Sequence, residues 1–417
     1  MQIFSLKSHK KQFSFFGGKR LKHFAPHILN LNFFKKKSLY QIMRTSLFKA
    51  ITFSILFFSA LQITAQTKIY VNAAATGSNT GADWNNAYTD LLNAITKAAT
   101  GNEIWVAKGN YSPGAVAAST FTLKTGVKIY GGFAGTESSL TQRIANAAGL
   151  FIANESILTG GNINNHVVSN LANVSKETVL DGFTISGGRT VNSNASNVVN
   201  RGAGIYNTAG SAVFQNLWIK DNIASNYGAG FFNSGTPTYL NLVLENNSFY
   251  NAAFSYTFGA GMYNAGAAVF KNVSFINNTG ASSGGGLYNT IVSTLEDNVF
   301  KNNTSTINGG GLTSTVSLTL DRLSFIQNTA GQQGGAIYAS GGMTIRNSIF
   351  SRNRVTGVAS THIGGAIYGI STALNIFNCS FSNNSISYVV ADNNTYGGAL
   401  NVNVVSNVYN SIFWGNK

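Results

Sequence analysis

The chain contains few of the residues that usually cross-link a domain or bend its backbone. Cys379 is the only cysteine among 417 residues, so no disulfide can form within the chain. There are only three prolines and five histidines, and charged residues make up 10% of the sequence. The 44% of hydrophobic residues argue against a disordered chain, and so few prolines argue against a collagenous one. Packing and hydrogen bonds must therefore hold this fold together.

Acidic residues are also scarce, because 13 Asp and Glu stand against 28 Lys and Arg. The formal net charge of +15 is nevertheless local: residues 1–49 contain 11 of the basic residues and no acid. Beyond them, 17 basic and 13 acidic residues leave +4. We expect the basic segment to be absent from the mature protein, so the sequence predicts no nucleic-acid partner.

The apolar run that follows this basic segment is short. It extends from Ala50 to Ile63, about 14 residues, whereas a membrane-spanning helix needs roughly 20. Arg44 and Lys49 precede the run and a small residue, Ala65, follows it, so residues 43–65 have the form of a signal peptide. We expect translation to begin at Met43, residues 1–42 to lie upstream of the true start, and the mature chain to begin near residue 66.

Glycine, by contrast, is abundant, and much of it belongs to a repeat. A Gly-x-Gly or Gly-Gly-x element recurs at intervals of 26, 31, 25, 25, 25, 30 and 33 residues. Its eight starts are Gly202, Gly228, Gly259, Gly284, Gly309, Gly334, Gly364 and Gly397. A large apolar residue follows each start: Ile219, Leu244, Phe275, Phe300, Phe325, Phe350, Phe381 and Phe413. Three residues later every unit has asparagine: Asn222, Asn247, Asn278, Asn303, Asn328, Asn353, Asn384 and Asn416.

A period near 25 residues is typical of leucine-rich repeats and of β-solenoids. The units are rich in Gly, Asn, Ser and Thr and contain no helical pattern, which favours the solenoid. The fold class is therefore all-β, a parallel β-helix of about 25 residues per coil. Equal positions of successive coils would stack, so we expect an interior phenylalanine column and an asparagine ladder at a turn.

The chain before the repeats is less regular. Residues 66–101 read as a strand and a capping helix, in which residues 84–99 place apolar side chains on one face, Asp83 is the N-cap and Gly101 follows the end. Residues 102–200 read as irregular coils and residues 201–417 as eight regular repeats, all within one domain, 66–417. Because the sequence stops at Lys417 inside a repeat, we expect the natural protein to continue.

Charged residues occupy one column of the repeat. Lys271, Glu296, Asp321 and Arg346 hold equal positions in consecutive coils, and Asp297 and Arg322 share the next column. Glu296 and Asp321 form the best carboxylate pair for glycoside hydrolysis, which needs two carboxyl groups. The alternating signs favour a neutralising surface ladder instead, since like charges in adjacent strands are unfavourable. The sequence accordingly predicts no catalytic residue.

Few residues offer metal or cofactor chemistry. His166 and His362 have no partner at the spacing of metal ligands, so no metal site is predicted. The Gly-x-Gly elements lack the strand-to-helix context of phosphate-binding loops and the aspartates of calcium repeats, and we interpret them as turns. Cys379 replaces small or apolar residues of its column and is expected to pack rather than react. No cofactor is predicted.

Three units carry extra residues at the same corner. Between the repeated asparagine and the next glycine element, four units have five residues, whereas 11 follow Asn247, 10 follow Asn353 and 12 follow Asn384. Insertions at one corner of a solenoid project from one edge, which commonly binds partners, although surface loops also lengthen at little cost. The candidate binding residues there are Tyr250, Phe254, Tyr256, Phe258, Arg354, His362, Tyr388, Asp392 and Tyr396.

Two resemblances extend this interpretation. GGAIY (364–368) and GGGLYN (284–289), paired with FINN (275–278) and FKNN (300–303), resemble the GGAI and FxxN repeats of chlamydial polymorphic outer-membrane proteins. Residues 78–114, followed by VKIYGGFAGTE (127–137), resemble the N-terminal part of secreted β-helix proteins of Bacteroidetes. These resemblances imply a right-handed parallel β-helix on a secreted or outer-membrane surface protein of a Gram-negative bacterium, often adhesin-like.

Adhesion is the function that these features favour. We expect a non-catalytic protein that recognises extracellular glycans or host or partner surface proteins, with membrane association only through a C-terminal region beyond Lys417. The alternative is a polysaccharide lyase or glycoside hydrolase acting on extracellular polysaccharide, because the same architecture supports many chemistries.

Overall fold

The computed structural model describes residues 68–190, 200–250, 256–357, 362–370, 373–387 and 395–417, with the backbone alone for residues 362, 395 and 396. The basic segment and the predicted signal peptide, residues 1–65, lie outside the described residues. So do three candidate binding residues, Phe254, Tyr388 and Asp392.

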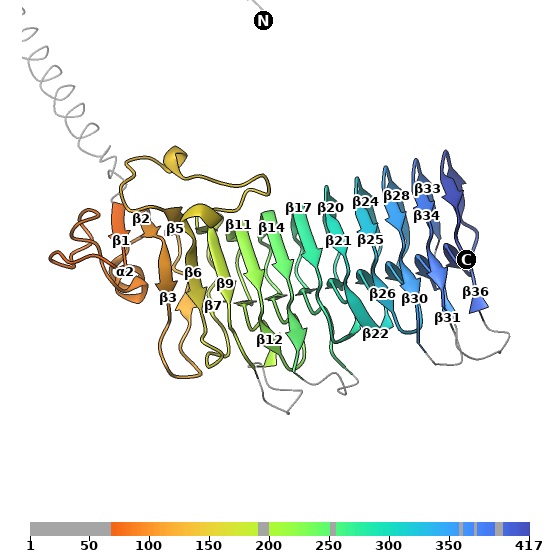
Figure 1. The fold of residues 1–417 in the computed structure, drawn as a ribbon, viewed down its shortest axis with the longest axis horizontal. Helices are drawn as coiled ribbons and strands as arrows, with labels where there is room; N and C mark the ends of the chain where they lie inside the picture. Colours follow the sequence, from red (N-terminus) through yellow and green to blue (C-terminus); the bar gives the residue numbers. More distant parts are fainter. Residues whose placement is uncertain (1–67, 191–199, 251–255, 358–361, 371–372, 388–394) are drawn as a thin grey trace, which may run out of the picture. The chain divides into compact units, whose positions relative to one another are not determined.

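The described chain winds into a parallel β-solenoid, which confirms the predicted fold class (Figure 1). Each regular coil passes through three strips of parallel strands, called here the C sheet, the A strip and the B strip. Short strands, called D strands, then lead to the next coil. The C sheet comes first in each repeat and consists of β4 (Phe121–Thr122), β7 (Val168–Asn170), β10 (Ile205–Asn207), β13 (Phe231–Asn233), β16 (Met262–Asn264), β19 (Leu287–Asn289), β23 (Leu312–Ser314), β27 (Ile337–Ala339), β32 (Ile367–Gly369) and β37 (Leu400–Val402).

The A strip follows in the chain after a short turn. It consists of β1 (Lys68–Val71), β2 (Glu103–Ala107), β5 (Lys128–Phe133), β8 (Val179–Asp181), the first halves of β11 (Val213–Lys220), β14 (Thr238–Glu245) and β17 (Val269–Ile276), and then β20 (Thr294–Glu296), β24 (Leu318–Asp321), β28 (Met343–Arg346), β33 (Leu374–Phe377) and β38 (Asn407–Tyr409).

The B strip completes the crossing. It consists of β3 (Gly109–Tyr111), β6 (Ser156–Thr159), β9 (Phe183–Ser186), the second halves of β11, β14 and β17, and then β21 (Val299–Lys301), β25 (Ser324–Ile326), β29 (Ile349–Ser351), β34 (Ser380–Ser382) and β39 (Ile412–Trp414). Short D strands lead back to the glycine element: β12 (Ile223–Ala224), β15 (Ser248–Phe249), β18 (Ala281–Ser283), β22 (Thr304–Asn308), β26 (Thr329–Ala330), β30 (Arg354–Val355), β31 (His362–Ile363), β35 (Ser385–Ile386) and β36 (Thr395–Tyr396).

Residues with positive φ make the bends of each coil. The first glycine of every repeat has a φ between 57° and 72°, a left-handed conformation that residues with a side chain disfavour. A second column of residues with positive φ lies between the A strip and the B strip, and a third lies at the end of the B strip. Their members are mostly Asn, which tolerates this conformation better than other residues. The second column is Asn216, Asn241, Asn272, Asp297, Arg322, Asn347, Asn378 and Asn410, and the third includes Asp221, Asn246, Asn277, Asn302, Gln327, Arg352 and Asn383.

The interior consists of stacked columns. The rings of Phe300 and Phe325 lie parallel, 4.6 Å apart at an interplanar angle of 5°, and neither is exposed. The same stack continues through Phe275, Phe350, Phe381 and Phe413 at 4.6 to 4.9 Å. Burying each such ring contributes roughly 1.5 to 3 kcal/mol. The ring at the end of the stack is different, since Phe413 is 42% exposed.

A buried asparagine ladder runs beside this stack. Each Asn from Asn222 to Asn384 donates its side-chain N–H to the side-chain oxygen of the next, at 2.9 to 3.1 Å. The same side-chain nitrogen of Asn328 also donates to the carbonyl of Phe300, in the coil before. Every rung therefore satisfies side chain and backbone together at the point where the chain bends.

The N-terminal helix is shorter than the sequence predicts. Helix α2 spans Leu91–Lys97 rather than residues 84–99, and its N-cap is Asp90, whose carboxylate accepts from the backbone N–H of Leu92. The predicted cap, Asp83, instead accepts from the N–H of Asn86 and stabilises the preceding turn. The prediction of Asp83 was wrong because both aspartates suit a cap, and only the pairing of this segment with β1 delays the helix. Leu91, Ala94 and Ile95 are buried against the first coil.

A long excursion covers the outer face of the early A strip. Residues 134–155 contain two 3-10 helices, η1 (Leu140–Gln142) and η2 (Ile152–Asn154). Arg143 in this segment forms a buried 2.9 Å ion pair with Asp181, and its guanidinium lies 4.2 Å from the ring of Phe151. The carboxylate of Asp181 also accepts hydrogen bonds from the side-chain amides of Gln215 and Asn216. Its charge is therefore compensated, and we assign Asp181 a structural role.

Candidate functional site

The first insertion exposes two aromatic rings. Tyr250 is 54% exposed and Tyr256 is 68% exposed, among the largest exposures of bulky side chains in the described residues. The guanidinium of Arg189, on a neighbouring coil, lies 5.1 Å from the ring of Tyr250. An exposed tyrosine offers an apolar face and a hydroxyl, which suits packing on a sugar ring or on a protein surface.

Phe258 closes the same insertion and packs against rings from other coils. It stacks with Tyr227 at 5.6 Å, and its ring lies 4.6 Å from that of Tyr288. Isolated parallel bridges join Tyr227 to Phe258 and Phe258 to Ser283, so the end of the insertion returns to the regular register. The insertion is therefore anchored at Phe258, while Tyr250 and Tyr256 face solvent.

Tyr288 belongs to an aromatic column that the sequence analysis did not predict. The central residue of each C-sheet strand points outward, and in six of the eight repeats it is aromatic: Tyr206, Phe232, Tyr263, Tyr288, Tyr338 and Tyr368. Phe232, Tyr263 and Tyr288 stack at 5.5 Å with interplanar angles of 2° and 6°. The signal was visible, since an aromatic residue follows the apolar residue of the glycine element in those repeats.

Burial and charge give this column a defined chemical state. Burial raises the pKa of Tyr263 and of Tyr288, so both hydroxyls stay protonated at neutral pH and can donate hydrogen bonds. The guanidinium of Arg201 lies 4.9 Å from the ring of Tyr227 and 5.4 Å from that of Phe232. The stacked rings cover one another's faces, so the column presents ring edges and hydroxyl groups rather than open faces.

His166 ends this column. Its ring stacks on Tyr206 at 4.6 Å, and Nδ1 lies 3.1 Å from the carbonyl oxygen of Gly202. Burial lowers the pKa of His166, so the ring is neutral at pH 7 and donates from Nδ1 to this carbonyl. Within the described residues, no group of three His, Cys, Asp or Glu side chains could hold a metal ion.

The second and third insertions meet each other but not the first. Strand β31 pairs in parallel with β36, so His362 lies opposite Thr395 and Ile363 opposite Tyr396 in register. The side chains of His362 and Tyr396 are outside the described residues. Arg354 is exposed and its Nε donates to the hydroxyl of Thr329 at 3.1 Å. The regular coils of β22 and β26 separate this pair of insertions from Tyr250 and Tyr256.

The carboxylate pair of the alternative hypothesis is occupied by an arginine. Arg322 forms ion pairs with Glu296 and Asp321, and its Nε donates to Asp297 at 2.7 Å. Hydrogen bonding from this guanidinium lowers the pKa of Asp297. A glycosidase needs one carboxyl group as acid and one free to attack, whereas here Glu296 and Asp321 are both ion-paired with the same guanidinium.

Cys379 is a packing residue in its surroundings. It is buried, and its thiol lies 3.2 Å from the carbonyl oxygen of Phe377. Burial raises the pKa of the thiol, which keeps it protonated and unreactive at neutral pH.

The comparison with protein families supports the repeat that the sequence analysis identified. The model of the Chlamydia polymorphic membrane protein repeat matches residues 272–290 and 322–340. Both matched segments begin at a left-handed corner residue and include the stacked phenylalanine, the ladder asparagine and the glycine corner. The chain is a parallel β-helix whose repeats are similar to those of Chlamydia polymorphic membrane proteins. No curated protein and no solved structure matches it.

Repeat and fold together indicate a surface or autotransporter-like protein. Among the residues that the structure describes, no helix has both the length and the apolar character needed to cross a bilayer.

Proposed function

We propose that this β-helix is a secreted or outer-membrane surface protein of a Gram-negative bacterium that recognises extracellular glycans or surface proteins without catalysing a reaction. The polymorphic membrane protein repeat supports the surface location. The signal-peptide form of residues 43–65 supports export across the inner membrane.

The observation that carries the recognition role is the exposed pair Tyr250 and Tyr256. Two bulky rings exposed by 54% and 68% on one insertion cost hydrophobic free energy unless a partner covers them. Phe258 packs on Tyr227 and Tyr288 and anchors the end of the insertion that follows Tyr256. Packing that holds a binding residue in place reduces the entropy that is lost on binding. Arg189 next to Tyr250 adds a cation that can donate to hydroxyl or carboxylate groups of a ligand.

The test is a binding assay on immobilised glycans and on intact cells, with the full chain and a Tyr250→Ala, Tyr256→Ala variant. Both side chains are exposed, so the variant should keep the melting temperature of the parent. Its binding should fall at least about tenfold if each ring contributes as a typical aromatic hot spot does. A matched control is Val404→Ala and Val405→Ala, which removes exposed apolar side chains from a coil without candidate binding residues. Equal binding by parent and tyrosine variant refutes the role of this insertion.

A further inference from the structure

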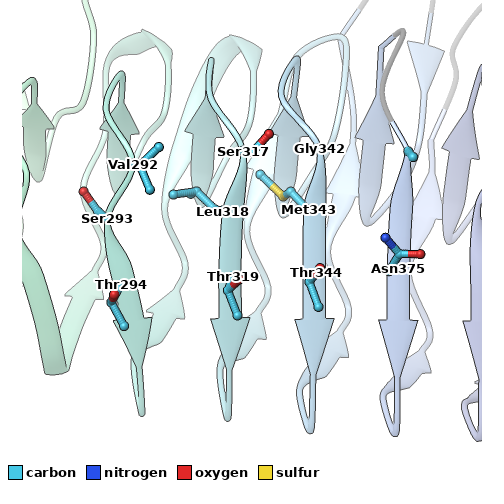
Figure 2. A pocket seen from close by; sticks show the side chains of 11 residues that line it. Val292, Ser293, Thr294, Ser317, Leu318, Thr319, Gly342, Met343, Thr344 and Asn375 are labelled. Atoms are coloured by element: carbon cyan, nitrogen blue, oxygen red, sulfur yellow. The ribbon is translucent and has the colours of Figure 1, made fainter.

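A groove lies on the outer surface where the C sheet turns into the A strip. It has a volume of about 510 Å³ and crosses four successive coils, at β20, β24, β28 and β33 (Figure 2). The insertions occupy a different corner, between the D strands and the glycine elements. The groove is thus separate from Tyr250 and Tyr256.

One wall of the groove is a row of hydroxyl and amide groups. Thr294, Thr319, Thr344 and Asn375 face each other in register on neighbouring strands. Parallel strands of this kind are about 4.8 Å apart, so the row repeats at that spacing along the solenoid axis. In the part of the chain that the structure describes, none of the three threonine hydroxyls makes a hydrogen bond to another protein group. These groups are free to bind a ligand.

The floor and the other wall are small or apolar. Leu318 and Met343 precede the threonines on their strands and belong to the core, with exposures of only 4% and 2%, so they support the groove from within. Ser317 and Gly342 occupy equal positions on the other side, and their small size makes room there. Val292 is 65% exposed at one end. Val292 and the threonine methyl groups can accept the C–H faces of a ligand whose hydroxyls reach the threonine row.

The charges beside the groove cancel. The next outward positions on these strands carry Glu296, Asp321, Arg346 and Phe377, and the preceding strand β17 carries Lys271 in the same column. The left-handed corner adds Asp297 and Arg322, so from β17 to β33 three acids face three bases. Arg322 is paired with three of the carboxylates already. A paired surface of zero net charge does not attract an anionic polymer.

A peptide has no free backbone to pair with in this groove. Strands β20, β24, β28 and β33 each pair with a neighbour on both sides. Addition of an extended peptide to a sheet needs an unpaired edge. Recognition here depends on side-chain hydroxyl groups that repeat along a straight line.

From these observations we propose that the groove binds an uncharged linear polysaccharide, lying along the solenoid axis across β20 to β33. Hydroxyl groups of successive sugars pair with the threonine row, and the C–H surfaces pack on the threonine methyl groups and on Val292. This site is independent of the insertion corner, so either can fail without the other.

Affinity electrophoresis of the full chain tests the proposal. The gels contain a mixed-linkage β-glucan, a glucomannan or, as the anionic comparison, polygalacturonate. We expect at least one neutral polymer to retard the protein, and about 0.5 M NaCl to leave that retardation unchanged because no ion pair is involved. Retardation by none of the neutral polymers, or by polygalacturonate alone and only at low salt, overturns the proposal.

Matched substitutions locate the site. The double variant Thr319→Val, Thr344→Val keeps the side-chain shape and removes two hydroxyls, so affinity should fall about tenfold. Thr238→Val changes the same column on β14, outside the groove, and should have no effect. Ser317→Trp, placed at an exposed position, should block the groove while the circular dichroism spectrum and melting temperature stay the same.

The loop variant separates this proposal from the recognition role of the insertion. Tyr250→Ala, Tyr256→Ala should bind the neutral polymer as the parent does. Loss of polymer binding in that variant, or unchanged binding in the threonine double variant, places the polymer elsewhere and overturns the groove assignment.

Discussion

The side-chain nitrogen of Asn303 donates a 3.0 Å hydrogen bond to the side-chain oxygen of Asn328, the equivalent residue one coil further along. The same oxygen accepts the backbone N–H of Asn303 at 3.1 Å, and both residues are fully buried. One amide thus links two coils through side chain and backbone at once. In this protein the same hydrogen bonds join neighbouring coils and satisfy buried polar groups.

Asn328→Ala should therefore destabilise the solenoid strongly. The substitution removes the acceptor of the backbone and side-chain N–H groups of Asn303 and the side-chain donor to the carbonyl of Phe300, all of them buried. The side-chain oxygen of Asn353 loses one of its two donors and keeps the backbone N–H of residue 328. We expect a loss of at least about 3 kcal/mol in the free energy of unfolding, measured by urea titration. Asn110→Ala, at an exposed strand position, is the control and should change it by less than about 0.5 kcal/mol. A similar small change for Asn328→Ala contradicts the ladder.

The phenylalanine stack gives a prediction that depends on position in the column. Phe325 is enclosed between Phe300 and Phe350, at 4.6 and 4.9 Å, so Phe325→Ala should cost about 3 to 5 kcal/mol of unfolding free energy. Phe413→Ala removes the same side chain from the exposed end of the column and should cost less than half as much. Equal losses in urea titrations of the two variants argue against a stack whose energy comes from enclosure.

The Arg322 cluster predicts a pH-dependent difference in stability. Arg322 lowers the pKa of Asp297 in the folded protein, so the stabilisation is present above the ordinary pKa of 3.8 and is lost as pH falls through the lower, folded value. Asparagine tolerates the left-handed corner, so Arg322→Asn removes the ion pairs without new backbone strain. Melting temperatures should differ between parent and variant at pH 7 and converge as the pH falls from 3.8 through the lower, folded pKa of Asp297. A difference that persists in acid means that backbone strain, not charge, is responsible.

His166 should titrate below its ordinary pKa. Burial lowers the pKa from 6.5, so between 6.5 and the folded value the unfolded chain binds a proton that the folded chain does not. Stability contributed by the neutral ring is present above pH 6.5 and decreases as pH falls through this window. His166→Phe keeps a ring stacked on Tyr206 and should flatten that part of the profile. Nuclear magnetic resonance of the imidazole protons measures the pKa directly, and a value above 6.5 contradicts the prediction.

Cys379 should react only after unfolding. Its thiol is buried and burial raises its pKa, so a thiol reagent such as dithiobisnitrobenzoate should modify the native protein at least about a hundredfold more slowly than the urea-unfolded chain. Cys379→Ala provides the background rate. Rapid modification of the native protein would show that the thiol is accessible.

The repeat predicted the architecture because each position in a coil stacks on the same position in the next coil. A residue that lies above its equivalent in the next coil meets the same neighbours, so Phe275, Phe300 and Phe325 could be placed in one column from their spacing alone. The ladder asparagines followed for the same reason. The left-handed corners were less evident, since Arg322 and Gln327 hold positions that Asn occupies elsewhere. There the neighbouring coils fix the backbone against local preference.

The environment of surface residues was harder to predict from the sequence than the stacked columns of the interior. The sequence identified the insertion that carries Tyr250 and Tyr256, but Phe258 proved to be an anchor, because its exposure depends on Tyr227 and Tyr288 in other coils. The helix start at Leu91 also depended on contacts that a local pattern does not contain.

By itself, the sequence determined that the chain coils, at which period, and which side chains face inward, since a strict repeat forces equal residues into equal environments. Only the tertiary structure decided that Arg322 neutralises Glu296 and Asp321, and that unpaired threonines line a groove. Those relationships join residues about 25 positions apart through side-chain directions and free volume, which depend on the packing of several coils at once.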